Sequence, residues 1–558
     1  MDIKEKIGNW IMETLKIEGD FGLIHPKYIK NGDYSFFAPA GKAEEFAKAL
    51  RLTPFAQGDF LSKIEVAGNF INIYLSKDFF SHSVKEILDK KEKFGANDLL
   101  KKEKTIIEYT DPNPFKQFHI GHLMSNTIGE AVAHITEANG AEVKRANYQG
   151  DVGIHVACAI WGIKNKGGIK NDGDIKEKAK YLGECYTLGA TTLKENENLK
   201  SEIQNINKKI YEKSDKELNE FYKWGKKVSL DYFEEMYQML GTKFDFYFFE
   251  SEVGDYGKNI VLEFLKKGIF EESDGAIVFR GENYDKRLHT RVFINSEGLP
   301  VYEAKELGLA KIKNDKYKYD KSIVITGNEI NEYFRVILAA MKEVFPDLAQ
   351  KTEHLSHGML RLPTGKMSSR TGDVITAEAL IEQVKEKILE KIKDREFPEQ
   401  EKKEIAEVVA IGAIKYSILR QAIGGDIVFD FDKSISFDGD SGPYLQYACV
   451  RANSVLEKSA QGRSASGGRP KNFEITELEK YLYRFPEVVE RAGREYAPHY
   501  IVTYLIELAS IFNSFYAKEK IIDENDPSSL YKITLTSATA YILHSGLSLL
   551  GIKVPKRM

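Results

Sequence analysis

The sequence predicts an α/β protein with a Rossmann-type parallel-sheet domain at its centre, a small N-terminal α/β domain and a C-terminal all-α helix bundle. The central domain is predicted from a buried strand at 104–110, a helix beginning near His122 and a second strand at 141–151. A strand, a helix and a strand in close succession form a parallel βαβ unit, which is right-handed by the usual rule. The bundle is predicted because apolar residues recur at helical spacing beyond residue 400.

Three domains are expected from the length and the local composition. A chain of 558 residues suggests roughly three or four domains at about 150 residues each. Two features of the sequence indicate the domain boundaries: a charged stretch ends near residue 100, and the pattern of apolar residues changes near residue 400. The expected domains are therefore 1–100, 101–400 and 401–558, and the central one carries a lysine-rich helical insertion at about 163–245.

The composition argues against several classes of protein. The formal net charge of −4 disfavours a generic basic nucleic-acid coat but leaves room for a local basic face. The cysteines Cys158, Cys185 and Cys449 form no CxxC pair, so neither a disulfide scaffold nor a zinc ribbon is expected. No apolar stretch approaches the roughly 20 residues of a membrane span, and the start has no signal-peptide core. We expect a cytoplasmic protein that binds no membrane and has no metal site of its own.

The tetrapeptide HIGH at 119–122 is the first candidate site. His119 and His122 stand at i and i+3, on one face at the start of a helix. A helix N-terminus offers free N–H groups and positive potential, and two imidazoles add donors without a large permanent charge. Gly121 removes a side chain, so a flat ring could lie against the backbone. The arrangement suits a nucleotide triphosphate at the carboxyl edge of a parallel sheet; the alternative is a pair of ordinary histidines at a helix start.

A second candidate site is the stretch PTGKMSSRTGD at 363–373. Lys366 lies on a loop flanked by glycines, from which it could reach a developing pentavalent phosphate and then withdraw. Taken alone, a loop of this kind is usually a solvated turn, and its lysine is exposed to solvent. In this order and with this separation, HIGH and KMSS together are a specific signal of a functional site, because a chance occurrence of both motifs is improbable.

HIGH followed by KMSS resembles the class I aminoacyl-tRNA synthetases. Three longer stretches are similar to those of the arginyl-tRNA synthetase family: DPNPFKQFHIGHLMSNTIGEAV (111–132), RANYQGDVGIH (145–155) and FDFDKSISFDGDSGPYLQYACVRANSV (429–455). The resemblance extends over the whole chain, from the N-terminal GNFINIYLS to the closing GIKVPKRM.

The resemblance implies a two-step reaction. The arginine carboxylate attacks the α-phosphate of ATP to give arginyl-adenylate and pyrophosphate, and the 3′ end of tRNA(Arg) then takes the arginyl group. Positioning and charge stabilisation should supply most of the acceleration. The expected partners are ATP with its Mg²⁺, L-arginine and tRNA(Arg), and the expected state is a monomer.

The resemblance also assigns catalytic and ATP-binding residues. Lys116, at a position that some family members use in place of the loop lysine, is expected to share catalysis with the two histidines and Lys366. The division of labour between the two lysines stays open. Arg370 replaces the second lysine of the usual KMSK, which keeps the charge but not the shape. ATP is expected to contact His119, Gly121, His122, Lys366, Ser368 and Ser369.

Arginine recognition requires planar carboxylate contacts to the guanidinium group. Tyr302 and Glu306 stand at i and i+4 on one helical face. The family usually has Asp at the second position, and Glu306 could also be an ordinary solvated helix residue. Ile330 replaces a glutamine of the family. The expected arginine-binding residues are Asn113, Asn147, Glu250, Tyr302 and Glu306, while Asp111 and Asp151 are expected to be structural.

For tRNA, the segment with Tyr444, Gln446, Tyr447 and Arg451 is polar and aromatic, which suits stacking and edge hydrogen bonds to single-stranded bases. The two tyrosines could instead be core residues. The N-terminal domain resembles the family's addition that grips the tRNA elbow. Two other functions stay open: a class I synthetase for another amino acid, and a catalytically weak RNA-binding paralogue, against which the intact motifs argue.

Overall fold

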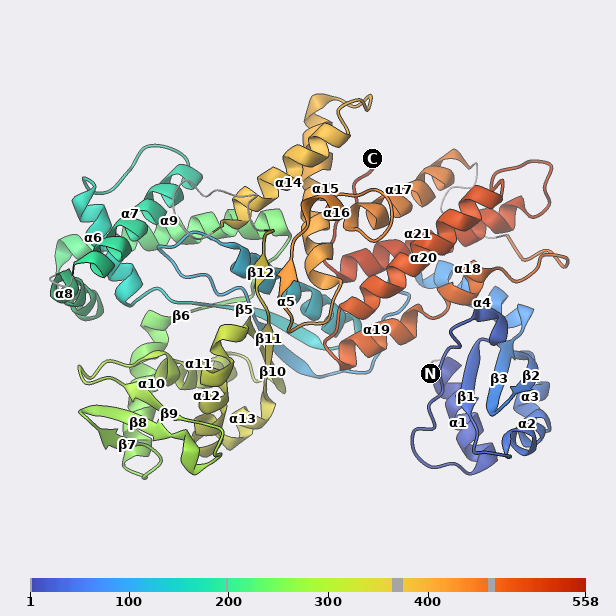
Figure 1. Ribbon diagram of the computed structural model, residues 1–558, viewed down its shortest axis with the longest axis horizontal. Helices are drawn as coiled ribbons and strands as arrows, with labels where there is room; N and C mark the ends of the chain where they lie inside the picture. The colour runs from blue at the N-terminus through green and yellow to red at the C-terminus, as the bar shows by residue number, and fades with distance from the viewer. Residues whose placement is uncertain (1–2, 197–198, 364–374, 460–466) are drawn as a thin grey trace. The chain divides into compact units, whose positions relative to one another are not determined.

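The computed structural model describes residues 3–196, 199–363, 375–459 and 467–558 (Figure 1). The chain forms two compact units. We call the first the sheet unit, made of Leu100–Lys387 and Ser417–Phe431. The second, the terminal unit, combines Met1–Leu99 with Ile388–Tyr416 and Asp432–Met558.

Five parallel strands form the core of the sheet unit, in the order β11-β10-β4-β5-β6. Along the chain, β4, β5 and β6 follow one another to one side, and β10 and β11 extend the sheet on the other side of β4. The strand order therefore reverses between β4 and β10, and ligands of such sheets bind at the carboxyl ends of the strands beside this reversal. The strands are β4 (Lys104–Glu108), β5 (Glu142–Gln149), β6 (Phe246–Phe249), β10 (Lys321–Gly327) and β11 (Thr352–His357).

Helices connect these strands, and the prediction of a Rossmann-type α/β fold is confirmed. The segment between β5 and β6 is helical, and a three-stranded antiparallel sheet lies between α10 and α11. The helices are α5 (Ile120–Ala138), α6 (Ile154–Asn165), α7 (Ile175–Glu195), α8 (Leu199–Glu212), α9 (Lys216–Leu240), α10 (Glu250–Leu265), α11 (Tyr302–Lys316), α12 (Asn331–Val344), α13 (Pro346–Lys351) and α14 (Ala377–Lys391). The small strands are β7 (Glu271–Ser273), β8 (Ala276–Arg280), β9 (Thr290–Ile294), β12 (Leu360–Arg361) and β13 (Ile427–Val428).

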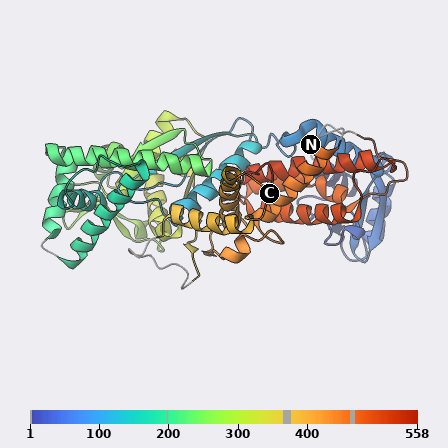
Figure 2. The ribbon, with the colours of Figure 1, turned by 90° about the horizontal axis from the view of Figure 1, so that it is seen from above.

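The terminal unit joins a small α/β part to a helix bundle. Its antiparallel sheet has the order β1-β3-β2. In the bundle, α20 and α21 pack against each other, as the red helices of Figures 1 and 2 show. The elements of the α/β part are α1 (Ile3–Leu15), β1 (Tyr34–Phe37), α2 (Ala43–Arg51), α3 (Pro54–Gln57), β2 (Leu61–Ala67), β3 (Phe70–Leu75) and α4 (Lys77–Lys90). Those of the bundle are α15 (Glu399–Leu419), α16 (Phe431–Ser434), α17 (Gly442–Lys458), α18 (Glu477–Leu482), α19 (Phe485–Arg494), α20 (His499–Lys518) and α21 (Ser529–Leu549).

Buried polar contacts tie the two parts of the terminal unit together. The hydroxyl of Tyr34 on β1 donates to Glu487 Oε1 on α19 at 2.5 Å, and His25 Nε2 lies 3.0 Å from Glu487 Oε2. Tyr483, from the bundle, packs in the hydrophobic core of the N-terminal part. The N-terminal sheet is thus anchored on α19.

None of the helices within the described part of the chain is long and apolar enough to cross a membrane.

Candidate active site at the carboxyl edge of the sheet

The turn that follows β4 is strained. Thr110 and Asp111 adopt left-handed backbone conformations, with φ of +78° and +43°, which side chains other than glycine rarely adopt. Two residues of α5 hold this turn: Ser125 Oγ accepts from the Thr110 N–H at 2.9 Å, and Asn126 Nδ2 donates to Thr110 Oγ1 at 3.1 Å. The backbone leading away from β4 is therefore fixed by buried hydrogen bonds.

The preceding residue, Tyr109, is held by the same helix. Its hydroxyl donates to Glu130 Oε2 at 2.6 Å, and its ring lies so close to Gly129 that a Cβ there would come within 2.1 Å of it. Although burial raises the pKa of Glu130, contacts with His134 and Arg145 hold it at about 2. The stretch SNTIGE, part of the family resemblance, thus positions the end of β4.

The two HIGH histidines cap α5 reciprocally. His119 Nδ1 accepts from the N–H groups of Gly121 at 3.1 Å and His122 at 3.4 Å, and His122 Nδ1 accepts from the His119 N–H at 3.2 Å. The rings stack with their centroids 3.6 Å apart. Because each Nδ1 accepts a hydrogen bond, each neutral ring carries its proton on Nε2. Each histidine therefore has one Nε2–H donor left for a ligand.

Both rings are neutral at pH 7. Burial and the nearby Lys116 lower the pKa of His119 to about 4. Burial, with His119 and Lys116, lowers the pKa of His122 well below its usual value. The pair thus offers hydrogen-bond donors without a positive charge.

The expectation of free N–H groups at the tip of α5 is wrong. The ring of His119 occupies those of Gly121 and His122, and the Ile120 N–H donates to Ile375 O at 3.1 Å. The ring beside Gly121 is also that of His119, because a Cβ at Gly121 would lie 2.9 Å from His119 Cε1. The imidazoles, rather than the helix backbone, carry the available donors.

The KMSS residues Lys366, Ser368, Ser369 and Arg370 lie outside the described residues. The segment that follows them pairs with the start of HIGH. Thr376 forms an isolated antiparallel β-bridge with His119, and the Ala377 N–H donates to Phe118 O at 2.9 Å. The described chain therefore resumes at the tip of α5.

Lys116 lies beside the HIGH histidines. Its Nζ is 5.2 Å from the ring centroid of Tyr186 on α7, and burial lowers its pKa. Its charge lowers the pKa of both histidines. The upstream lysine and the HIGH motif thus share one neighbourhood.

A group of buried and half-buried ionisable residues surrounds the end of β4. We call these residues, Glu108, Asp111, Tyr302, Glu306 and Lys313, the acidic cluster. Glu306, on α11, is 4% exposed and lies near Tyr302, which lowers its pKa, so it is not a solvated helix residue. Burial and the neighbouring Glu108 raise the pKa of Glu306 to about 8. Its carboxyl group is therefore costly to ionise until a cation approaches it.

Lysines of α11 neutralise two other carboxylates. Lys313 Nζ lies 2.7 Å from Glu108 Oε2, and Lys305 Nζ lies 2.5 Å from Glu250 Oε2. Neither Glu306 nor Asp111 makes an ion pair with any residue in the described ranges. Glu250, expected to bind arginine, already has a cationic partner.

Glu108 and Lys313 were missed from the sequence. Two signals could have revealed them. Glu108 is a charged residue at the end of an apolar strand, and Lys313 stands two helical turns after Glu306, on the same face.

The structure brings Asn113 and Glu250 together around Gly150. A Cβ there would lie 2.3 Å from Asn113 Oδ1 and 3.1 Å from Glu250 Oε1. Asn147, fully buried on β5, donates through Nδ2 to Tyr109 O at 3.2 Å, while its Oδ1 has no partner among the described residues. These side chains thus lie at the carboxyl ends of β4, β5 and β6.

The expected tRNA-binding residues lie on α17 in the terminal unit. Tyr444 and Arg451 both hydrogen-bond to Asn513 of α20, at 2.9 Å and 2.6 Å, and the Arg451 guanidinium lies over the rings of Tyr447 and Tyr516. We call these five partly exposed residues the polar-aromatic patch. The two expected tyrosines are half-buried rather than core residues.

Gln446 does not belong to this patch. It is fully buried, and its Nε2 donates to the backbone oxygens of Lys553 at 2.7 Å and Val408 at 3.3 Å. The expected contact of Gln446 with tRNA is therefore corrected: the buried side chain ties α17 to α15 and to the C-terminal segment.

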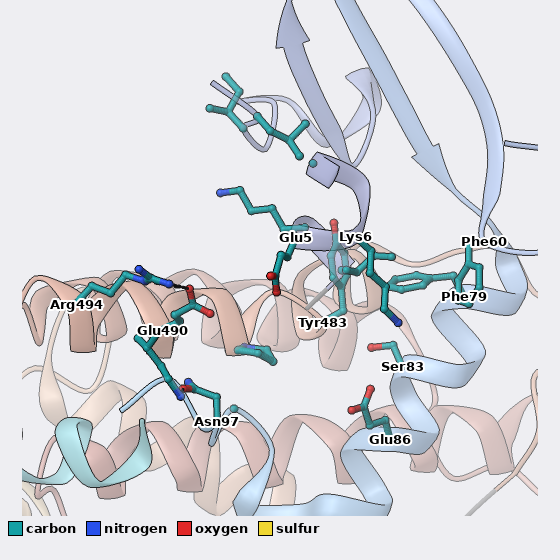
Figure 3. Close-up of a pocket in the computed structure, with 18 of the residues that line it drawn as sticks. Glu5, Lys6, Phe60, Phe79, Ser83, Glu86, Asn97, Tyr483, Glu490 and Arg494 are labelled. Carbon is teal, nitrogen blue, oxygen red and sulfur yellow. Dashed lines mark hydrogen bonds and ion pairs between the residues drawn. The ribbon is translucent and has the colours of Figure 1, made fainter. Parts of the chain in front are cut away.

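A cavity of about 1320 Å³ in the terminal unit contains none of the expected site residues. It is lined by α1, α4, α19 and the segment near Asn97, with acidic and basic side chains interleaved (Figure 3). Arg494 and Glu490, one turn apart on α19, form an ion pair on its wall.

Family models match most of the chain. The model described as "tRNA synthetases class I (R), catalytic domain" matches residues 83–431, and the "DALR anticodon binding domain" matches residues 445–558. The chain belongs to the arginyl-tRNA synthetase family. The prediction made from HIGH, KMSS and the longer stretches is thereby confirmed.

Curated relatives and solved structures agree. An arginine–tRNA ligase of Borrelia turicatae is 31% identical over 534 residues, covering 92% of this chain and 91% of its own. One of Halothermothrix orenii is 30% identical over the full length of both chains. The fold is similar to that of Thermus thermophilus arginyl-tRNA synthetase, with a TM-score of 0.81, 23% identity and full coverage of both chains.

These matches confirm the predicted activity of this arginyl-tRNA synthetase family member, which is arginine–tRNA ligation. A synthetase for another amino acid and a catalytically weak paralogue are set aside.

Proposed function

We propose that arginine binds at the acidic cluster and ATP at the HIGH histidines of α5. One observation carries the arginine site: Glu306 is a buried carboxyl group beside Tyr302 and has no ion pair in the described structure. A planar guanidinium group supplies the missing positive charge and pairs with both oxygens of a carboxylate. Asn113 and Asn147 supply amide groups at the same edge of the sheet, and Glu250 positions Lys305 and Asn113.

The adenylation step follows from this placement. The arginine carboxylate forms a bond to the α-phosphorus of ATP, and the bond to pyrophosphate breaks. Neutral His119 and His122 donate their Nε2–H groups to phosphate oxygens, which requires no proton transfer. Lys366 enters from the KMSS loop to stabilise the charge on the transferring phosphate, with Ser368 and Ser369 shaping that loop. Lys116 provides a second positive charge beside the histidines.

Mg²⁺ bound to ATP would neutralise part of the charge of the phosphates. In the second step the terminal ribose hydroxyl of tRNA attacks the arginyl carbonyl, and AMP leaves. Gly121 keeps the space that the His119 ring needs for its cap.

For tRNA, we assign residues 401–558 to the anticodon and residues 1–100 to the elbow, with residues 101–400 performing the chemistry. The partly exposed rings of Tyr444 and Tyr447, with Arg451 stacked beside them, suit unpaired bases. We further propose that the protein acts as a monomer in the cytoplasm with tRNA(Arg) as its substrate.

The test of the arginine site is Glu306→Gln, assayed by arginylation of tRNA. Gln keeps the size but loses the charge, so kcat/KM for arginine should fall by at least about a hundredfold, mostly through KM. The matched control is Glu303→Gln, which alters a buried glutamate of the same helix that pairs with Arg291 instead. Equal activity of Glu306→Gln and Glu303→Gln would contradict the proposal.

A further inference from the structure

We infer that Ser229 and Gly225 of α9 are positioning residues for Lys116, so that the helical insertion between β5 and β6 contributes to adenylation through this lysine. The inference rests on the catalytic role proposed above for Lys116. Ser229 and Gly225 lie outside every stretch on which the family resemblance was recognised. Their contacts with Phe115, the residue that precedes Lys116, carry the inference.

The backbone of Phe115 is strained and is held by α9. Phe115 is fully buried, and its φ of +69° lies in the left-handed region that residues other than glycine rarely adopt. Its N–H donates to Ser229 Oγ at 2.8 Å, and Ser229 Oγ donates to the backbone oxygen of Gly225 at 2.9 Å. The hydroxyl of Ser229 is thus used in both directions, and its loss would leave a buried N–H without this partner.

A glycine of α9 makes room for the ring of Phe115. A Cβ at Gly225 would lie 2.2 Å from Phe115 Cε1. Glycine is unfavourable in the interior of a helix, and α9 has 25 residues. Tyr222, one turn earlier, stacks on the same ring with the centroids 6.0 Å apart. The close approach of Phe115 accounts for the glycine at this position.

A glycine of α7 receives the residue on the other side of Lys116. A Cβ at Gly183 would lie 2.8 Å from Gln117 Cγ. The ring of Tyr186, one turn further along α7, lies 5.2 Å from Lys116 Nζ. Lys116 is therefore presented between two residues that fit against glycines of the insertion, and its ammonium group lies beside an aromatic ring.

Helix α9 is itself fixed to the carboxyl edge of the sheet. Asp151, which follows β5 and is fully buried, accepts from Lys226 Nζ at 2.7 Å and from the Tyr222 hydroxyl at 2.8 Å. It also accepts from the N–H of Ser251, at the start of α10, at 2.9 Å. The helix that holds Phe115 thus has a fixed place relative to β5 and α10.

The test is a double-mutant cycle on the full chain, measured by ATP–pyrophosphate exchange with arginine and tRNA present. Ser229→Ala removes the acceptor of the Phe115 N–H and should lower kcat at least about tenfold, because a small misplacement of a catalytic group is costly. The KM values for arginine and ATP should change by less than about threefold, because the buried Ser229 touches neither substrate. In Lys116→Met, Ser229→Ala should lower kcat by no more than about twofold further, since no lysine is left to position.

The matched control is Thr192→Ala on α7. The hydroxyl of Thr192 also donates to the backbone oxygen one turn earlier, that of Leu188 at 2.7 Å. Its removal should leave kcat unchanged. Equal losses from Ser229→Ala with and without Lys116 would show a purely structural role and overturn the inference. An unchanged kcat for Ser229→Ala alone would also overturn it.

If Ser229→Ala fails to fold, Gly225→Ala supports the same cycle, because its Cβ displaces the ring of Phe115 from the helix side. A loss of kcat that persists in full in Lys116→Met would again overturn the inference. Lys116→Met with the kcat of the wild type would instead refute the catalytic role of Lys116, so the two failures are distinguishable.

Discussion

The acidic cluster of the sheet unit and the polar-aromatic patch of the terminal unit recognise ligands by different physical means. In the cluster, buried carboxyl groups outnumber the single lysine, and burial raises the pKa of both Glu306 and Asp111. In the patch, Arg451 and Tyr444 share Asn513 and stay partly exposed. The cluster therefore selects by charge, whereas the patch offers flat rings to flat bases.

The difference has consequences for pH and salt. A cation bound in the cluster must displace protons, which makes arginine affinity depend on pH. Stacking on the patch is a contact between flat faces, and the response of tRNA binding to salt is set by the phosphates of tRNA. The same protein should thus show a pH-dependent KM for arginine and a salt-dependent KM for tRNA.

The largest expected effect is on the stability of the cluster. Replacing Lys313 by Met leaves Glu108 buried without its cation, and breaking a buried pair in this way costs about 3–5 kcal/mol. Calorimetric unfolding of Lys313→Met should show a markedly lower transition temperature. The control is Lys311→Met on the same helix, whose ion pair with Asp315 is partly exposed and contributes at most about 1 kcal/mol. Similar transition temperatures for the two variants would mean that Glu108 and Lys313 are not coupled.

A smaller effect is expected at the patch. Stacking of a base on an aromatic ring contributes about 1–3 kcal/mol, so Tyr447→Ala should raise the KM for tRNA by roughly five- to a hundredfold. The KM for arginine should stay unchanged. Tyr500→Ala is the matched control, because Tyr500 of α20 also lies under an arginine, Arg491, but outside the patch. A rise in the KM for arginine, or an equal loss in both variants, would contradict separate recognition by stacking.

The local motifs could be predicted from the sequence, but their partners could not. HIGH placed His119 and His122 at the start of a helix after the first strand, because strand, helix and glycine signals are local. The reciprocal cap, which occupies the N–H groups of Gly121 and His122, depends on ring orientation that spacing alone does not specify. Lys313 meets Glu108 across more than two hundred residues, so their pairing appears only when α11 packs against β4.

Burial was the other quantity that the sequence did not provide. Gln446 stands between two tyrosines of a polar-aromatic segment, yet the helical rotation turns it into the core while its neighbours stay partly exposed. Glu306 could be a solvated residue or a ligand, and only its burial against Glu108 and Tyr302 decides for the cluster. A residue type predicts possible chemistry, whereas the environment determines which chemistry is used.

Proton release on arginine binding tests the central claim most directly. Glu306 has a pKa of about 8 in the free protein and is ionised when it pairs with guanidinium, so binding below that pH must expel a proton. Calorimetric titrations with arginine at pH 7, in buffers of different ionisation enthalpy, should show net proton release that fades by pH 9 and is reduced in Glu306→Gln. Binding enthalpies at pH 7 that do not depend on the buffer would contradict a substrate cation completing a buried carboxyl cluster.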